Sequence, residues 1–372
     1  MEHIFPKFRA AAVQAASVFM DREATTDKAC DLIREAAGNG ARLIVFPESY
    51  IAGYPHWAWL HTVKDGQKFF PLLVKSSVTV PSDITDRLCR TAKDCDAYVA
   101  IGINETSSSS YGEIFNTLLF IGPDGSIISK HRKLIPTFYE KLVWSFGDGS
   151  ALRTHKTDIG CVGMLICGEN ANPLARFALI AEAEQVHIAN FPALPQSGQV
   201  GGYSMRKAIE IRGAAHSFEG KVFTVASTSI IDDTIRDLIG DTPEHLEALQ
   251  DGGTGFTGIF GPNGMVVAGP LPDNEEGIVY GDLDLEDGIG WKQYHDYAGN
   301  YNRFDILSLN VNRTPISPLH VQGSEAPASD PRPLHGGNIA PLVERLQDRL
   351  KGVEDAGLRR ELERLVNEIV KV

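Results

Sequence analysis

Short runs of consecutive apolar residues alternate along the chain with segments whose apolar residues recur every three or four positions. Runs such as 43–46 and 161–166 are almost wholly apolar, which is typical of strands buried on both faces. We expect strands at 9–15, 43–46, 97–104, 115–121, 127–134, 161–166, 186–190, 222–226 and 278–283, with a further hairpin at 255–269. Helical spacing predicts helices at 21–37, 84–93, 173–185 and 204–218. This alternation predicts a layered α/β protein with a mixed sheet.

The C-terminal part of the chain has a different composition. Residues 318–341 are rich in Pro, Gly, Ser and His, which predicts a linker or arm, and residues 342–370 have the spacing of an amphipathic helix. We therefore divide the chain into a main domain, 1–315, and a C-terminal arm, 316–372. The helix of that arm packs either on a neighbouring subunit or on its own body. The acidic segment 228–253 is only weakly periodic, which fits either a flap near the functional site or an exposed excursion.

Composition and charge exclude several classes of protein. The chain has 372 residues, 43% of them hydrophobic and 22% charged, so it can bury a substantial core. Its net charge of −13 argues against binding to nucleic acid or to an anionic membrane surface. The five cysteines form no CxxC pair, which predicts neither a disulfide framework nor a zinc site. The sequence shows no signal-peptide pattern and no membrane-spanning run, so we expect a reduced, soluble, cytoplasmic protein.

Cys167 directly follows the apolar run 161–166 and precedes a polar turn. Asn172 is a favourable N-cap and Pro173 suits the first position of a helix, so Cys167 is expected in a strand-to-helix turn. A side chain there can face a cleft, and nearby backbone N–H groups can hold an anion. A small buried hydrophobe is the alternative interpretation of a cysteine. The charged Glu169 close behind favours the rim of an active site.

Two further charged residues follow predicted strands. Glu48 comes directly after the buried run 43–46 and Pro47, at the edge of the sheet where α/β proteins place their chemistry, although a solvated loop acid would look the same. Lys133 ends the basic run Lys130–Lys133; we expect its first three residues to form a solvated edge and Lys133 to point inward. Glu140, seven residues later, is the carboxylate that an inward lysine needs to stay charged in a dry cleft.

The segment 50–61 contains four aromatic residues and two histidines, and it fits either a core segment or the wall of an apolar substrate pocket. Its histidines do not form an HExxH helix, so we expect no metal site there.

Four stretches of the sequence together resemble one enzyme family. They are PESYIAGYP, KHRKLIPTFYEKLVW, CGENANPLARFALIAEAEQVHIANFP and GNYNRFDILSLNVNR. Over residues 8–315 the chain resembles the nitrilase branch of the carbon–nitrogen hydrolase superfamily, with the three catalytic motifs in the right order. The resemblance implies a four-layer αββα sandwich with Glu48 as general base, Lys133 as catalytic lysine and Cys167 as nucleophile. Glu140 matches a second glutamate that supports the lysine and the substrate.

The resemblance implies a nitrilase that converts an organic nitrile to the carboxylic acid and ammonia. Glu48 takes the thiol proton, Cys167 attacks the nitrile carbon to give a thioimidate, and Lys133 and the N–H of Gly168 stabilise the charge on nitrogen. No metal or organic cofactor is required. We expect the substrate pocket to be formed by Tyr54, Trp57, Trp144, Asn190 and Phe191. Members of this branch form dimers and larger spirals, so we also expect a homo-oligomer.

One residue departs from the family pattern, and several alternatives remain. Gly168 stands where nitrilases usually have tryptophan, so the range of substrates cannot be transferred. The same Glu-Lys-Cys triad serves amidases, carbamoyl hydrolases and cyanide-hydrolysing enzymes. A catalytically silent scaffold that assembles through its C-terminal arm is a further alternative. The last is a Cys–His hydrolase of papain type, for which His187 is the one plausible base.

Overall fold

The computed structural model describes residues 3–195, 204–250 and 253–319, and within these ranges twelve strands form two six-stranded sheets. The first sheet has the order β12-β1-β2-β3-β4-β5, with bounds Gly277–Asp284, Lys7–Gln14, Ala41–Val45, Tyr98–Thr106, Ile114–Ile121 and Ile127–Arg132. The second has the order β11-β10-β9-β8-β7-β6, with bounds Val266–Ala268, Gly258–Phe260, Phe223–Thr228, Val186–Phe191, Gly160–Ile166 and His155–Thr157.

Both sheets are mixed, as the pattern of strands predicts. In the first, β1, β2 and β3 are parallel, while β4, β5 and β12 pair antiparallel with their neighbours. In the second, β7, β8 and β9 are parallel, with antiparallel β6 and β10 on either side. The hairpin between β4 and β5 turns at the predicted Pro-Asp-Gly sequence, where Gly125 has a φ of 82°.

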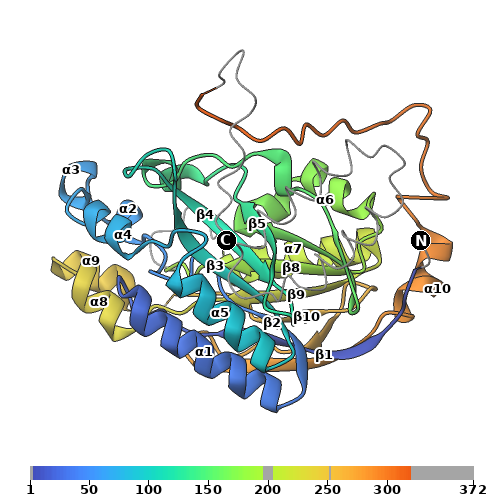
Figure 1. Cartoon of the computed structure of the whole chain (residues 1–372), viewed down its shortest axis with the longest axis horizontal. Helices are drawn as coiled ribbons and strands as arrows, with labels where there is room; N and C mark the ends of the chain where they lie inside the picture. The colour runs from blue at the N-terminus through green and yellow to red at the C-terminus, as the bar shows by residue number, and fades with distance from the viewer. Residues whose placement is uncertain (1–2, 196–203, 251–252, 320–372) are drawn as a thin grey trace, which may run out of the picture. The chain divides into compact units, whose positions relative to one another are not determined.

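The two sheets stack face to face with helices on both outer faces, which confirms the four-layer αββα architecture. Helices α1 (Arg22–Gly38) and α5 (Asp83–Asp94) lie side by side over the first sheet, and α6 (Pro173–Ile180) and α7 (Met205–Gly220) cover the second (Figure 1). Apolar residues of both sheets form the central core, among them Val45, Leu118, Ile166 and Ile188. A separate core fills the space between the first sheet and α1 and α5.

The ends of the helices follow local capping rules. Asp21 caps α1 by accepting a hydrogen bond from the Ala24 N–H, and Asn172 caps α6 by accepting from the N–H of Leu174. The helix at α6 is shorter than the expected 173–185, because it ends at Ile180 and the chain turns through residues 181–185 toward β8.

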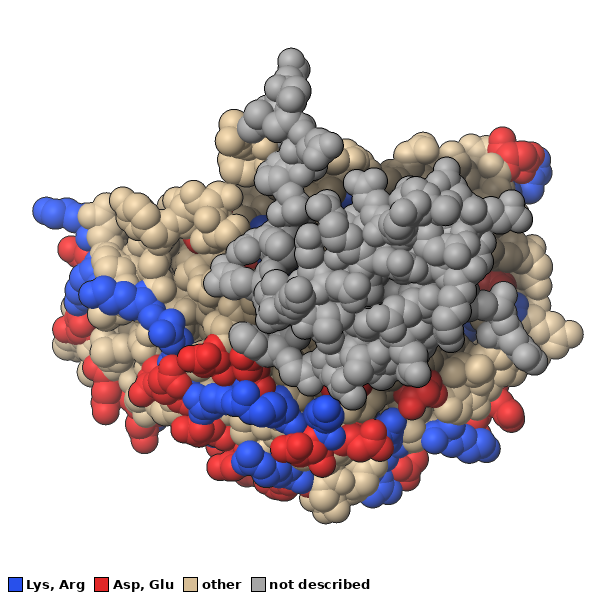
Figure 2. Space-filling view, viewed as in Figure 1, with Lys and Arg blue, Asp and Glu red and all other residues tan. Residues whose placement is uncertain are grey.

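On the face in Figure 2, acidic and basic side chains alternate over α1 and α5. Arg87, for example, pairs with Glu23 across the two helices.

The described part of the acidic segment 228–253 is folded and partly buried, so it is not simply an exposed excursion, and its packing beside Tyr54 is compatible with a flap near the functional site. It contains α8 (Asp233–Ile239) and α9 (Pro243–Leu249). Ile235, Ile239 and Leu249 of these helices are buried with Tyr54 and Trp57 in one cluster, while Leu238 and Leu246 are exposed. Short helices α2 (Trp57–Leu60), α3 (Val63–Gly66) and α4 (Phe70–Ser76) lie in the segment after β2, and α10 (Asp287–Tyr294) follows β12.

The chain divides into two units, of which the first, Met1–Ile316, holds both sheets. The amphipathic helix expected at 342–370 lies outside the described residues, so its existence and packing stay predictions. None of the described helices combines the length and the apolarity that crossing a membrane requires.

Candidate active site

Three of the expected site residues lie where strands end. Glu48 follows β2 after a two-residue connection, Lys133 follows β5 directly, and Cys167 follows β7 directly. Glu48 and Lys133 therefore come from the first sheet and Cys167 from the second. The Glu48 N–H donates to the carbonyl oxygen of Phe191 at the end of β8, 3.3 Å away, which ties the two sheets together at this point.

The structure brings the four expected catalytic residues together in a buried cluster. Lys133 Nζ donates to Glu48 Oε1 at 2.7 Å and to Glu140 Oε2 at 2.6 Å. The Cys167 sulfur and one carboxylate oxygen of each glutamate all lie within 4.8 Å of one another. Because all four residues are at most 6% exposed, their charges interact in a poorly solvated environment.

The two carboxylates are held differently. Glu140 accepts hydrogen bonds at both oxygens, from the Tyr54 hydroxyl at 2.7 Å and from the Thr137 N–H at 2.6 Å in addition to Lys133. Glu48 accepts a second bond from Asn116 Nδ2 at the same oxygen that Lys133 contacts. The other oxygen, Glu48 Oε2, is buried and has no partner among the described residues. Glu140 is therefore fixed as a support, while Glu48 keeps one oxygen available to accept a proton.

Burial and neighbouring charge set the protonation states of the cluster. Burial raises the pKa of Glu48 to about 7, against the opposing effect of the Lys133 ammonium. Burial disfavours the charged form of Lys133, but Glu140 and Glu48 outweigh it and hold the pKa of the lysine well above its usual range. Burial, followed by the Glu48 charge, raises the pKa of the Cys167 thiol. The resting nucleophile is therefore a neutral thiol that needs a base, and Glu48 titrates in the right range to be that base.

The backbone adopts a strained conformation at Cys167 and close to Glu48 and Glu140. Cys167 itself has a φ of 47°, Ser49 next to Glu48 has 45°, and Phe138 at the start of the Glu140 turn has 47°. Non-glycine residues rarely adopt this left-handed region, and such strain persists only where the surroundings enforce it. The sequence carries no signal for these three positions.

A glycine allows the turn that carries Glu48 to approach the first sheet. A Cβ atom at Gly102 in β3 would lie 2.3 Å from the backbone nitrogen of Ser49. Any side chain there would displace Glu48, because the obstructing atoms belong to the backbone.

Gly168 lies directly behind the candidate nucleophile. A Cβ at this position would be 2.7 Å from Oγ1 of Thr137, which precedes the short turn η1 (Phe138–Leu142) and whose N–H donates to Glu140 Oε2. Any larger residue here, the usual tryptophan included, would therefore require Thr137 to shift.

The structure places two of the expected aromatic pocket residues beside the cluster. Tyr54 donates to Glu140, and its ring lies edge-on to Trp144 at a centroid distance of 5.5 Å. The Trp144 ring lies 5.8 Å from Lys133 Nζ, and its Nε1 donates to Asn104 Oδ1. Trp57, in contrast, packs on Phe69 and lines a separate cavity with α3 and α4, so its link to the cluster is through Tyr54 and Trp144.

Asn190 and Phe191, the other two expected pocket residues, end β8. Asn190 pairs in register with Ile166, the residue immediately before Cys167. It is fully buried, yet neither atom of its amide has a hydrogen-bond partner among the described residues. A buried amide without partners costs about 1–3 kcal/mol, and its donor and acceptor are available to a bound molecule.

Sequence reasoning missed Asn116 and placed His131 wrongly. Asn116 interrupts the apolar run 114–121, and an amide in the middle of a buried strand was an available signal. His131 was expected on a solvated edge, but it is fully buried because its Nε2 pairs with Glu169 Oε2 at 2.9 Å. Glu169 in turn accepts from the N–H groups of Ile166 and Leu134 on either side of the site.

Among the residues that the structure describes, two groups have the spacing of metal ligands. Glu48, Glu140 and Cys167 form one, but the Lys133 ammonium already lies against both carboxylates. The residues Glu184, His187 and His216 form the other, and they are hydrogen-bonded to one another. Since both groups already have protein partners, neither needs an ion to balance its charge.

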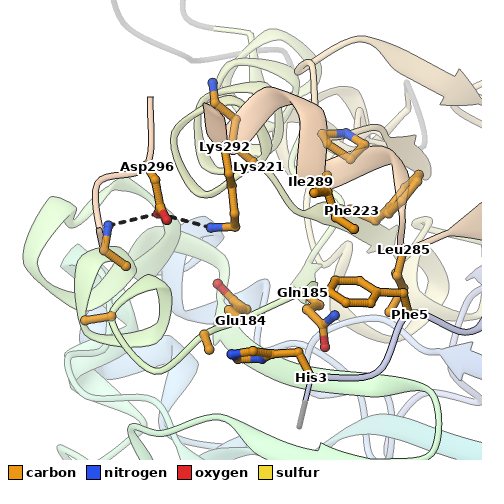
Figure 3. Close-up of a pocket in the computed structure, with 15 residues that line it drawn as sticks. His3, Phe5, Glu184, Gln185, Lys221, Phe223, Leu285, Ile289, Lys292 and Asp296 are labelled. Carbon is orange, nitrogen blue, oxygen red and sulfur yellow. Dashed lines mark hydrogen bonds and ion pairs between the residues drawn. The ribbon is translucent and has the colours of Figure 1, made fainter. Parts of the chain in front are cut away.

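The cavity in Figure 3 is separate from the catalytic cluster. It has a volume of about 350 Å³ and is lined by apolar side chains such as Phe223 and Leu285, with Lys221 and Lys292 at its edge. Lys292 pairs with Asp296 at 3.3 Å. The candidate nucleophile, base and lysine do not line this cavity.

Comparison with known proteins agrees with this geometry. The family model described as "Carbon-nitrogen hydrolase" matches residues 9–293. A nitrilase of Bacillus sp. (strain OxB-1) is 38% identical over 87% of this chain and 93% of its own length, and an aliphatic nitrilase of Rhodococcus rhodochrous is 36% identical over 88% and 85%. The crystal structure of Saccharomyces cerevisiae Nit3, a member of branch 10 of the nitrilase superfamily, has the same fold, with a TM-score of 0.60 at 21% identity over 78% of this chain and 94% of that one.

The chain belongs to the carbon–nitrogen hydrolase family, in its nitrilase branch. It is accordingly a hydrolase that acts on carbon–nitrogen bonds.

Proposed function

We propose that this enzyme hydrolyses an organic nitrile to the carboxylic acid and ammonia, with Cys167 as nucleophile, Glu48 as general base and Lys133 as electrophilic partner. The observation that carries the proposal is the buried contact of one thiol, one ammonium and one carboxylate with an unpartnered oxygen. The similarity to curated nitrilases over most of the chain supports the choice of a nitrile among carbon–nitrogen substrates.

The first half of the reaction uses all three groups. Glu48 Oε2 accepts the thiol proton as Cys167 Sγ attacks the nitrile carbon, and the triple bond becomes the C=N of a thioimidate. Negative charge develops on nitrogen and is stabilised by the Lys133 ammonium and the Gly168 N–H. Glu48 then passes the thiol proton to this nitrogen and is ionised again. Glu140 keeps Lys133 charged and in place throughout, because it accepts from Lys133 at 2.6 Å.

The second half hydrolyses the covalent intermediate. Glu48 removes a proton from water as its oxygen adds to the thioimidate carbon, and passes that proton to the nitrogen. It then transfers the remaining hydroxyl proton of the tetrahedral intermediate to the nitrogen, so that ammonia leaves and a thioester remains. A second water cleaves the thioester, releasing the carboxylic acid and restoring the thiol. Expulsion of the thiolate instead of ammonia gives the amide as a side product.

We place the substrate against Tyr54, Trp144, Asn190 and Phe191. Tyr54 and Trp144 contact the Glu140–Lys133 pair, and Asn190 offers an unused buried amide beside the strand that ends at Cys167. Aromatic walls with one or two convergent polar groups are typical of a pocket for a small, mostly apolar molecule. Trp57 belongs to a layer behind these residues and acts on the pocket through them.

We also propose that the enzyme acts in the cytoplasm as a homo-oligomer, with residues 316–372 contributing to assembly. Its five cysteines are unpaired, which fits a reducing compartment. Leu174 and Ile211, on the two helices that cover the second sheet, are 62% and 57% exposed. Apolar side chains of this size on one outer face suit contact with another copy. Light scattering of the full chain measures the number of subunits.

A substrate panel tests the proposed function. Short aliphatic, aromatic and arylacetic nitriles, each beside its own amide, are scored for ammonia and for the ratio of acid to amide. We expect ammonia from at least one nitrile at a rate well above that from the matching amide. Turnover of amides alone would assign the same site to an amidase and overturn the proposal.

A further inference from the structure

A second buried polar cluster lies behind the candidate nucleophile, on the outer face of the second sheet. Glu184, in the turn before β8, binds two histidines at once. Its Oε1 lies 2.7 Å from His187 Nδ1, and its Oε2 lies 2.6 Å from His216 Nε2. The two imidazole rings lie against each other at a centroid distance of 3.7 Å. All three side chains have no exposed surface.

The cluster is linked to the Cys167 turn through one amide. His187 Nε2 lies 2.8 Å from Asn170 Oδ1. On its other side, Asn170 Nδ2 donates to the carbonyl oxygen of Leu165 at 3.1 Å and to that of Cys167 at 3.2 Å. A continuous series of hydrogen bonds therefore runs from Glu184 to the backbone of the nucleophile.

The partners determine where the protons are. Asn170 Nδ2 faces two carbonyl oxygens, so its Oδ1 faces His187 and requires Nε2 to carry a hydrogen. The contact between His187 Nδ1 and Glu184 contains one further proton, which either atom can hold. His216 donates from Nε2, which leaves its Nδ1 as an acceptor without a partner among the described residues. In both forms the group is neutral overall, which is compatible with its complete burial.

The second sheet leaves room for this cluster. A Cβ atom at Gly163 in β7 would lie 1.9 Å from Glu184 Oε1, so only glycine allows the carboxylate to lie against the strand that leads to Cys167. The cluster therefore depends on residues from β7, β8, α7 and the turn after the nucleophile.

We propose that His187 is a positioning residue: through Asn170 it holds the strained backbone of Cys167 in its reactive conformation. Cys167 has a φ of 47°, so its carbonyl must be held against relaxation, and Asn170 is the side chain that binds it. Glu184 and His216 hold the ring of His187 in turn. The inference rests on the proposed role of Cys167 as nucleophile.

This geometry removes the papain-type alternative. Neither nitrogen of His187 is free to accept a thiol proton, because Nδ1 faces Glu184 and Nε2 faces Asn170. His187 thus acts on the reaction through Asn170 and not by contact with the reacting atoms.

Two substitutions at the same position separate positioning from a merely structural role. In His187→Gln the side-chain amide reaches the position of Nε2 and can still donate to Asn170, whereas in His187→Asn it reaches only the position of Nδ1. Nitrile-dependent ammonia release gives kcat and KM for both variants, with kcat expressed per substrate-protected thiol titrated with iodoacetamide. This normalisation removes unfolded molecules from the comparison.

We expect His187→Asn to lower kcat per titrated thiol by about 10- to 100-fold with KM within about threefold, the scale of a small misplacement of a reacting group. His187→Gln should retain kcat within about threefold. Equal values for the two variants, or a wild-type value for His187→Asn, would overturn the proposal. If His187→Asn is not recovered folded, Asn170→Ser, which removes the donor to the Cys167 carbonyl, takes its place with the same expected loss.

Two controls complete the design. Cys167→Ala is measured in parallel: turnover in that variant contradicts the proposed function, while an inactive Cys167→Ala beside a fully active His187→Asn contradicts the positioning role alone. Metal analysis of the purified enzyme is the other. Stoichiometric metal that is lost in His216→Asn would make the cluster a metal centre and overturn the hydrogen-bond assignment.

Discussion

Lys133 binds only one of the two carboxylate oxygens of Glu48. Lys133 Nζ lies 2.7 Å from Oε1, and Oε2 has no partner among the described residues. The lysine therefore holds the carboxylate in place without occupying the oxygen that must accept the thiol proton. This separation lets one residue be both a counterion and a base.

Removal of the nucleophile should abolish turnover without unfolding the protein. Cys167→Ala deletes a single sulfur atom, and ammonia release from a nitrile should fall below about 1% of the wild-type rate, well within the loss expected of a covalent nucleophile. Circular dichroism checks that the fold is retained. Residual activity above that level would discredit the assignment of Cys167.

The rate should depend on pH through Glu48. The base must be ionised to accept a proton, and burial raises the pKa of Glu48 to about 7. We therefore expect kcat/KM to rise about tenfold per pH unit below that value and to level off above it. Since Glu48, Lys133 and Glu140 interact, the measured pKa belongs to the group. A rate that is flat between pH 5 and 8 would exclude Glu48 as the base.

Asn116 should tune that pH dependence. Its Nδ2 donates to Glu48 Oε1 at 2.6 Å and so favours the ionised carboxylate. Asn116→Leu removes the donor, so the pKa of Glu48 should rise and the acidic limb of the profile should move to higher pH. A shift toward lower pH, or none, contradicts the role of this amide.

Glu48→Gln should inactivate the enzyme and yet stabilise its fold above pH 7. Because the pKa of Glu48 is higher folded than unfolded, stability falls as pH rises from about 4.5 to about 7, by on the order of 3 kcal/mol. Glutamine mimics the protonated acid and avoids that loss. Melting temperatures at pH 5 and pH 8 should differ less in the variant than in wild type.

Glu105 offers the matched control for that measurement. It is also buried, but Arg132 and Lys130 overcome burial and hold the pKa of its carboxyl below the usual range. Its contribution to stability is therefore present above its unfolded pKa, and Glu105→Gln should lower the melting temperature at pH 8. The same sign for both variants would refute the electrostatic explanation.

Gly168→Ala should disturb Glu140 through Thr137. The added methyl would lie 2.7 Å from Thr137 Oγ1 and displace Thr137, whose N–H donates to Glu140 Oε2 at 2.6 Å. Weakening this hydrogen bond to a buried carboxylate costs on the order of 1 kcal/mol, so we expect a lower melting temperature and a severalfold lower kcat. A double-mutant cycle with Thr137→Ala checks the mechanism, because the two effects should not add.

The sequence predicts the site well where chemistry follows a buried strand. Glu48 and Cys167 each come after an apolar run, and Lys133 ends the basic run that closes β5; the ends of such strands converge in layered α/β proteins. Periodicity also predicts a layered α/β protein, while the four-layer arrangement was expected from the family resemblance. It cannot predict which strands become neighbours: β12 pairs with β1 although more than 260 residues separate them, and that pairing depends on the closure of the whole sheet.

Positions without local periodicity were predicted less well. Helices α8 and α9 bury only a few residues each, such as Ile235, Ile239 and Leu249, so their pattern is weak in an acidic segment. The burial of His131 depends on Glu169, a partner 38 residues away, and a run of basic residues on an edge strand does not reveal it. Tertiary contacts decide both cases.

The base and the lysine follow strands of one sheet and the sulfur follows a strand of the other. The rate of catalysis should therefore depend on the relative position of the two sheets. A sideways slip smaller than an atom's width would part sulfur from base while leaving each strand ladder intact. Mild heating should abolish catalytic activity before any secondary structure melts. Substitutions meant to stabilise the active enzyme should therefore first target the contact between the two sheets at Glu48 and Phe191, before the outer helices.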